Sequence, residues 1–201
     1  MKTADVIIVG SGASGLFNAL FLPQDYKVIV ITKKEVEESD SFLAQGGISA
    51  LKNPEDYDSY FEDTMKAGHY ENDKGAVEKM IKESPQIIQD LKDFGVRFDL
   101  KDGEIEFTRE GGHSTFRILH HEDLTGKEIT SHLYEEAKKR DNITIMENCT
   151  MIDIIEKDGE CKGIVYKDAD GNLDTIESSG YSFLQQEDLE GYLNILQTSD
   201  I

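Results

Sequence analysis

The first part of the chain alternates short apolar runs with a segment of helical apolar spacing. Residues 5–9 form a β-branched run, and "LFNALFL" after it spaces its apolar residues as a helix does, up to Pro23. Residues 26–32 form a second, continuous apolar run, which is typical of a strand buried in a parallel sheet. The pattern therefore predicts a βαβ unit and an α/β fold.

Helical periodicity dominates the middle of the chain, over residues 55–68, 74–95 and 124–140. Within the second of these segments, the pattern "ESPQ" predicts a break between two helices. Ser84 is expected to cap a new helix, and Pro85 is expected to occupy its first position, where its missing N–H costs nothing.

The later part of the chain has the spacing of strands. Apolar and polar residues alternate between residues 142 and 177, and turn-forming residues interrupt them at Asp158-Gly159 and at Asp170-Gly171-Asn172. This part is therefore expected to form strands joined by tight turns.

The charge balance narrows the range of partners. The chain has 21 Lys+Arg against 41 Asp+Glu, a net charge of -20, and such a field repels nucleic-acid phosphates and anionic lipids. The start "MKTADVIIVG" lacks a signal sequence, and no run approaches the roughly 18 apolar residues of a membrane span. Cys149 and Cys161 have no metal-binding spacing and are expected to be reduced thiols. We therefore expect a cytoplasmic protein with no nucleic-acid or membrane partner.

A glycine-rich turn lies between the first strand and the first helix. In Gly10-x-Gly12-x-x-Gly15 the first glycine makes the turn, the second lets a pyrophosphate approach the backbone, and the third lets helix and strand pack closely. The helix N-terminus adds N–H groups and a positive dipole. Within a βαβ unit this pattern predicts a dinucleotide site, the alternative being a turn without a ligand. The residues expected to contact the cofactor are Gly10, Ser11, Gly12, Ala13, Ser14 and Gly15.

The second strand ends at Thr32-Lys33-Lys34, where the usual dinucleotide site has an acid that binds the ribose hydroxyls. Lys33 therefore requires an extra phosphate or a different adenosine geometry. The alternative is that Lys33 is an ordinary solvated surface lysine.

Two further segments carry candidate chemistry. "SFLAQGGISA" has small residues that let backbone approach a flat cofactor. "TREGGHSTFRILHHEDLTG" concentrates acids, arginines and histidines. Its adjacent His120 and His121 point in different directions on any helix or strand and are expected to be structural. No histidine pair has metal-ligand spacing, so no metal is expected.

In this order, "GSGASGL", "ITKK", "SFLAQGGISA" and "TREGGHSTFRILHHEDLTGKEI" resemble the L-aspartate oxidase family over about residues 5–177. These FAD-dependent enzymes belong to the superfamily of the succinate dehydrogenase and fumarate reductase flavoproteins. The resemblance implies an incomplete Rossmann-like FAD-binding domain with a helical segment and the start of a capping domain, within residues 1–177. Asp40 stands where covalent members carry a histidine, so the resemblance implies noncovalent FAD.

The resemblance also implies roles for individual residues. The glycine turn would bind the FAD pyrophosphate, and Lys33 would lie on the adenosine side. Glu110 would recognise the ammonium group of L-aspartate, with His113 and Arg117 in the same catalytic motif, although Arg117 could instead pair with Glu122 or Asp123. The residues expected near the flavin and its ribityl chain are Ser41, Phe42, Leu43, Ala44, Gln45, Gly46 and Gly47.

The implied reaction is hydride transfer from the α-carbon of L-aspartate to flavin N5, which gives iminoaspartate. Oxygen or fumarate would reoxidise the flavin, and quinolinate synthase is a candidate partner, since this is the first step of NAD synthesis. One alternative is a fumarate reductase or succinate dehydrogenase-like flavoprotein, which Asp40 and Glu110 disfavour. Another is a non-catalytic FAD-binding fragment.

The resemblance ends near Glu177. The family continues with a strand ending in ATGG, whereas this chain reads "SSGYSFLQQED". Codons for Gln185 to Asp188, read one base earlier, can spell ATGG. Residues 178–201 are therefore expected to be an out-of-frame tail, not native to the fold. Because the family's later residues supply further site groups, the chain alone is expected to be inactive.

Overall fold

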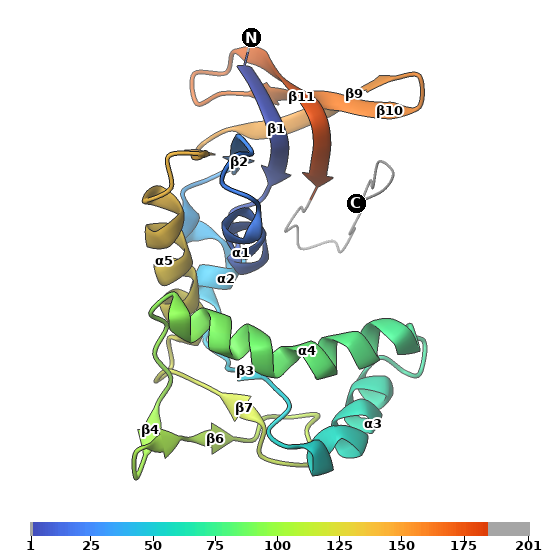
Figure 1. Ribbon diagram of the computed structural model, residues 1–201, viewed down its shortest axis with the longest axis vertical. Coiled ribbons are helices and arrows are strands. Elements are labelled where there is room, and N and C mark those ends of the chain that lie inside the picture. The colour runs from blue at the N-terminus through green and yellow to red at the C-terminus, as the bar shows by residue number, and fades with distance from the viewer. Residues whose placement is uncertain (1, 185–201) are drawn as a thin grey trace. The chain divides into compact units, whose positions relative to one another are not determined.

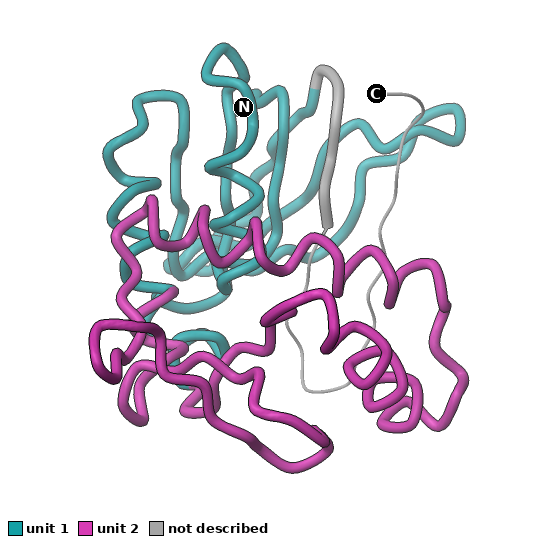
Figure 2. Tube along the Cα trace, turned by 60° about the horizontal axis from the view of Figure 1, so that its bottom comes forward, with its two compact units in different colours: residues 1–43, 130–201 teal, residues 44–129 magenta. Residues whose placement is uncertain are grey.

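A computed structural model describes the backbone of residues 2–184 and the side chains of residues 2–178. The chain divides into two compact units, residues 1–43 with 130–201, and residues 44–129 (Figure 2). Each unit is considered by itself below.

Unit 1 contains a six-stranded sheet in the order β8-β2-β1-β11-β10-β9 (Figure 1). The four strands from β8 to β11 are parallel to their neighbours, and β10 and β9 continue the sheet as an antiparallel hairpin. The strands are β1 (Lys2–Val9), β2 (Val28–Ile31), β8 (Ile143–Met146), β9 (Thr150–Lys157), β10 (Glu160–Lys167) and β11 (Leu173–Leu184).

The predicted βαβ unit is confirmed. β1 and β2 are joined through helix α1 (Ala13–Phe21) and run parallel, with Val6 opposite Val28 and Val9 opposite Ile31. All four residues of β2 are buried, as the continuous apolar run predicted. One face of the sheet packs a core of apolar side chains: Ala4, Ile7, Val9, Ile29, Ile31, Cys149, Ile164, Tyr166 and Ile176. The observed fold is α/β.

Strand β11 lies beside β1 and completes the centre of the sheet. Ala4 pairs with Ser178, but Val6 pairs with Tyr181, so β11 has one residue more than β1 in this interval. Such a mismatch is a β-bulge. Of the expected tail, residues 178–184 belong to β11, and residues 185–201 lie outside the described part of the chain.

Both predicted turns are confirmed in unit 1. Asp158 and Gly159 have φ values of 57° and 81° and join β9 to β10, as expected of a two-residue hairpin turn. In the next turn the Asp168 carboxylate accepts the backbone N–H groups of Asp170 and Asn172. The remaining elements of this unit are the 3-10 turn η1 (Val36–Glu38) and helix α2 (Asp40–Leu43).

Unit 2 is mainly helical and has two small sheets. Its helical core joins Tyr60 and Met65 of α3 to Val77 and Ile81 of α4. The elements are β3 (Ile48–Ser49), η2 (Pro54–Asp56), α3 (Tyr57–Ala67), α4 (Lys74–Asp93), β4 (Leu100–Lys101), β5 (Glu104–Ile105), β6 (Phe107–Thr108) and β7 (Ile118–Leu119). Helix α5 (Thr125–Lys138) begins in this unit.

The predicted helix break at Ser84 is wrong, because α4 continues through Pro85. Pro85 has no N–H to give to the Ile81 carbonyl one turn earlier. The Ser84 hydroxyl donates to that carbonyl instead, at 2.8 Å, and accepts the Leu51 N–H at 2.8 Å. Ser84 therefore replaces the missing backbone bond, and the helix does not need to end. No described helix has the length and apolarity to cross a membrane.

Candidate functional site

The glycine turn of unit 1 has the geometry of a phosphate cradle. Gly10 follows β1 with φ 112°, a conformation that L side chains rarely adopt, and its N–H donates to the Ile31 carbonyl at 2.8 Å. A Cβ on Gly15 would lie 2.1 Å from the Gly10 carbonyl oxygen. The first and third glycines are thus both required by the backbone, as the fingerprint predicts.

The N-terminus of α1 is left open for an anion. Gly12 is the N-cap, no side chain among the described residues caps the helix, and its first turn has no acid. The free N–H groups and the helix dipole therefore suit a pyrophosphate. The buried Ser11 hydroxyl donates to Thr32 Oγ1 at 2.9 Å, so the side chain holds the turn to the end of β2. Ala13 is half-buried and Ser14 is exposed on the first turn of the helix.

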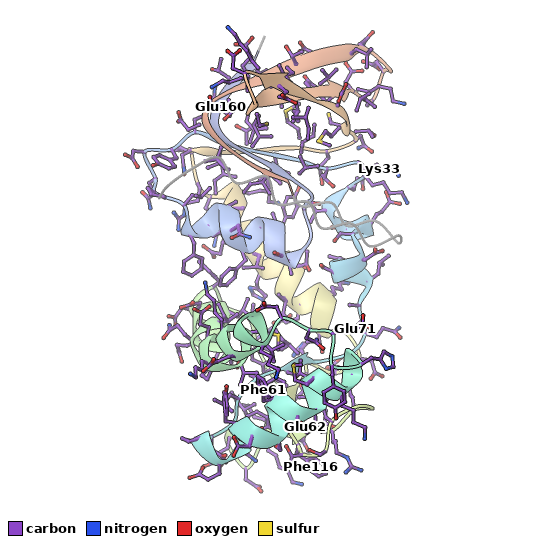
Figure 3. All side chains as sticks on the ribbon, turned by 90° about the vertical axis from the view of Figure 1, so that its right-hand side faces the viewer. Lys33, Phe61, Glu62, Glu71, Phe116 and Glu160 are labelled. Carbon is purple, nitrogen blue, oxygen red and sulfur yellow. The ribbon has the colours of Figure 1, made fainter. Side chains whose placement is uncertain are left out.

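The expected adenosine side lies where β2 ends. Lys33 is exposed (Figure 3), while Lys34 forms an ion pair with Glu38 at 3.3 Å. The contact of Lys33 with adenosine stays a prediction.

The first three of the expected flavin residues form the short helix α2. Asp40 begins it, and the Ser39 hydroxyl accepts the Phe42 N–H at 3.3 Å. Ser41 and Phe42 are half-buried, and Leu43 is 63% exposed. The other four residues, Ala44, Gln45, Gly46 and Gly47, belong to unit 2.

In unit 2 the structure brings the "AQGG" and "TREGG" segments together. The Gly47 N–H donates to Glu110 Oε1 at 2.9 Å, and a Cβ on Gly46 would lie 3.5 Å from Glu110 Oε2. Gly47 is required here because a Cβ would lie 2.3 Å from the Ile118 side chain and 2.4 Å from the Leu119 carbonyl oxygen. The Glu110 carboxylate therefore lies directly against the glycine backbone.

Glu110 and His113 are the two ends of a tight turn. The His113 N–H donates to the Glu110 carbonyl at 3.3 Å, and Gly112 has φ 87°. A positive φ at the third position is the mark of a type II turn. A Cβ on Gly111 or Gly112 would meet no atom within 4 Å among the described residues. The turn is therefore open on its outer side.

Arg117 is fully buried, and protein acceptors take all of its donors. Nε and Nη2 form a fork on the Asp56 carboxylate at 2.9 and 2.7 Å, and Nη1 donates to Asp63 Oδ2 at 2.6 Å. Nη2 also donates to Ser59 Oγ at 2.7 Å and Nη1 to His113 Nδ1 at 3.0 Å. A guanidinium has five N–H groups. Arg117 pairs with Asp56 and Asp63, rather than with Glu122 or Asp123.

The contact with Arg117 helps to lower the pKa values of the Asp56 and Asp63 carboxyls. Hydrogen bonds from Arg117 lower the pKa of Asp56 from 3.8 to about 2. Burial alone would raise the pKa of Asp63, but hydrogen bonds from Ser114 and Arg117 lower it overall. Both groups are therefore ionised at neutral pH, and the cluster carries a cation between two anions.

Two histidines of the motif lie among other acids. His120 Nδ1 is 3.0 Å from Asp99 Oδ2, while the two nitrogens of His121 lie 3.6 Å from Asp99 and 3.8 Å from Glu128. Arg97 also donates to Glu128, at 3.1 Å. The structural role expected of both histidines stays a prediction. The described residues contain no group of three His, Cys, Asp or Glu side chains able to hold a metal.

The sequence interpretation missed Asp56 and Asp63. Asp56 is the N-cap residue of α3 and Asp63 lies in its second turn, about two helical turns further on, so both carboxylates reach the same side of the helix. That spacing, together with an arginine in an otherwise apolar "FRIL" run, was the available signal.

The chain belongs to the FAD binding domain family, whose profile matches residues 5–190. The expected cofactor, FAD, is thus confirmed. Among curated proteins, the chain is similar to the L-aspartate oxidases of Clostridium perfringens, at 42% identity over 82% of this chain and 38% of that protein, and of Clostridium acetobutylicum, at 46% over 79% and 37%. The chain thus spans less than two fifths of these relatives, and its resemblance to their family is confirmed.

Solved structures of the wider superfamily share the fold. E. coli quinol fumarate reductase superposes with a TM-score of 0.85 at 25% identity, over 92% of this chain and 33% of that one. The Sdh1 complex of Mycobacterium smegmatis gives a TM-score of 0.81 at 27% identity, over 91% and 34%. The sequence is therefore nearer to these oxidases than to either respiratory flavoprotein.

Proposed function

We propose that this chain is the FAD-binding and amine-recognising part of an L-aspartate oxidase. The observation that carries the proposal is the Glu110 carboxylate, held on an open glycine turn against the Gly47 N–H. The high identity to the two clostridial oxidases supports the same substrate. A cytoplasmic location and quinolinate synthase as a partner also belong to this proposal. The location is supported by Cys149 and Cys161, which are both free thiols, as is usual in a reducing compartment.

Glu110 suits an ammonium group because one of its oxygens is fixed and the other is accessible. The Gly47 N–H holds Oε1 at 2.9 Å, and the residue is exposed. Oε2 accepts no hydrogen bond from the described residues, so it is available to a ligand. An L-aspartate ammonium would form a charge-assisted hydrogen bond there, whereas succinate offers no donor.

The residues of unit 1 fit FAD. Gly10, Gly12 and Gly15 leave the open N-terminus of α1 for the pyrophosphate, and Lys33 is proposed for the adenosine side. When bound, FAD would supply the hydride acceptance that converts L-aspartate to iminoaspartate, with oxygen or fumarate as final acceptor. The protein residues bind and orient: His113 and Arg117 belong to the segment that carries Glu110.

A titration of the FAD-loaded, ¹⁵N-labelled chain with L-aspartate tests this function. The Gly47 amide signal reports on Glu110 directly, because its N–H donates to the carboxylate. We expect a saturable shift of this signal with L-aspartate. A Gly47 signal that stays in place while FAD is bound would refute the proposal.

Noncovalent attachment of FAD is part of the proposal and separates it from a succinate dehydrogenase-like flavoprotein. Asp40, at the start of α2, has no nucleophilic nitrogen for a flavin bond. Acid precipitation of the loaded protein should therefore release all flavin into the supernatant. Flavin that remains with the pellet would favour the respiratory alternative. A chain that takes up no FAD would contradict both.

The out-of-frame origin of residues 178–201 also remains our proposal. The sequence supports it, since codons for Gln185 to Asp188, read one base earlier, can spell the ATGG of the family. The coding DNA provides the test. A one-base change near the start of this segment should restore ATGG and a long open frame; its absence would rule out the frameshift.

A further inference from the structure

The contact between Arg117 and His113 fixes the protonation of the imidazole. Arg117 Nη1 lies 3.0 Å from His113 Nδ1. A guanidinium can only donate, so Nδ1 must be the acceptor and carry no proton. A neutral imidazole has its one proton on the other nitrogen. His113 is therefore the Nε2–H tautomer as long as Arg117 keeps its place.

Asp56 and Asp63 keep Arg117 in that place. The fork on Asp56 fixes the plane of the guanidinium, and Asp63 Oδ2 fixes Nη1, the atom that faces His113. Asp63 Oδ2 also accepts the backbone N–H of Ser114 at 2.7 Å and its hydroxyl at 2.8 Å. One carboxylate thus holds both the guanidinium and the residue after His113.

The turn is consequently held at both ends. Glu110 is fixed through Oε1 to the Gly47 N–H, and His113 is fixed through Nδ1 to Arg117. Between them, a Cβ added to Gly111 or Gly112 would meet no atom of the described residues within 4 Å. The turn therefore carries a carboxylate acceptor at one end and an Nε2–H imidazole at the other.

We propose that Asp56 and Asp63 are positioning residues that act through Arg117 to present His113 as an Nε2–H donor beside Glu110. His113 Nε2 makes no hydrogen bond with the described residues, since it is Nδ1 that contacts Arg117. A carboxylate oxygen is the complementary acceptor, so the turn would recognise an ammonium through Glu110 and a carboxylate through His113. This inference rests on the proposed function, because it concerns the same turn and substrate class.

The tautomer can be measured in the unaltered chain. Long-range ¹H–¹⁵N correlation spectra at alkaline pH, with Gln in place of His113 (H113Q) to assign the signals, show which ring nitrogen carries the proton. We expect a protonated Nε2 and an unprotonated Nδ1 for His113. A proton on Nδ1, or a rapid mixture of both forms, would overturn the inference without any further variant.

The positioning role is tested with Asp63→Asn, with the exposed Asp58→Asn on the same helix as control. In Asp63→Asn the His113 tautomer should become mixed and the affinity for L-aspartate should fall about tenfold. Asp58→Asn should leave the tautomer unchanged and the affinity within about twofold. Asp63→Glu, which keeps the charge, should retain the wild-type tautomer. Wild-type tautomer and affinity in folded Asp63→Asn would show that Asp63 positions nothing.

The two proposals fail in different ways. If His113 has the expected tautomer but L-aspartate does not shift the Gly47 amide, the proposed substrate is wrong and the anchoring through Arg117 stands. If L-aspartate binds but His113 carries its proton on Nδ1, the positioning role is wrong and the proposed function stands.

Discussion

Replacing Asp56 by asparagine is expected to destabilise unit 2 severely. Asp56 is 9% exposed and Arg117 is 0% exposed, and two of the five guanidinium N–H groups donate to the two oxygens of this carboxylate. Asparagine offers one oxygen and directs an NH2 group at the second donor. Breaking a buried ion pair from one side costs about 3–5 kcal/mol, a large share of the roughly 5–15 kcal/mol by which domains are stable.

The pKa shift of Asp56 gives a second estimate of how much its contact with Arg117 stabilises the folded chain. The pKa of Asp56 falls from 3.8 to about 2 on folding, which corresponds to about 2 kcal/mol. Because the folded pKa is the lower one, this stabilisation is fully present above pH 4. It is lost as the pH falls toward 2, where the carboxyl becomes protonated in the folded state as well. Asp56→Asn should lack this part of the acid sensitivity.

Urea unfolding followed by circular dichroism, together with amide hydrogen exchange in α3, measures the loss. Asp58→Asn is the matched control, because Asp58 is exposed in the first turn of the same helix and should cost at most about 1 kcal/mol. If Asp56→Asn costs no more than this control and retains the wild-type acid sensitivity, the buried ion cluster does not stabilise unit 2.

Two further substitutions test other parts of the fold. In Gly15→Ala the new Cβ would lie 2.1 Å from the Gly10 carbonyl oxygen, so FAD binding should weaken at least tenfold in a fluorescence titration. The control Gly111→Ala, whose Cβ meets no described atom within 4 Å, should bind FAD normally. Equal FAD affinities of the two variants would contradict the role of the glycine turn as a phosphate cradle. Ser84→Ala should lower the free energy of unfolding, measured in urea, by about 1–3 kcal/mol. Adding Pro85→Ala should recover part of this free energy, because the alanine N–H can donate to the Ile81 carbonyl. If the double variant recovers none of it, the Ser84 hydroxyl does not replace the missing backbone bond.

The parts of the fold that the sequence predicted are those with local causes. The βαβ unit, the glycine turn and the hairpin turns each depend on residues close together in the chain, so period and turn chemistry were sufficient. The break predicted at Pro85 failed because a side chain, Ser84, supplied what the backbone lacked. Local rules treat proline as a helix start and do not include this replacement.

The site was predictable only in part, because its contacts join residues that lie far apart in the sequence. Glu110, His113 and Arg117 stand in one recognisable motif, but the partners of Arg117 lie more than a whole helix away in the sequence, in η2 and α3. Although Asp56 and Asp63 are spaced to share one side of a helix, nothing in the sequence near Arg117 identifies them as its partners. Likewise, the contact between Glu110 and Gly47 joins two motifs that only the fold brings together.

The most direct test of amine recognition by Glu110 compares the affinities for L-aspartate and succinate in the FAD-loaded chain and in its Glu110→Gln variant. Glutamine keeps the size of the side chain and its acceptor for the Gly47 N–H, but it has no charge for the ammonium. We expect that the unaltered chain prefers L-aspartate and that Glu110→Gln loses about tenfold in affinity for L-aspartate, with little change for succinate. An unchanged preference in Glu110→Gln would contradict the recognition of the substrate amine by Glu110.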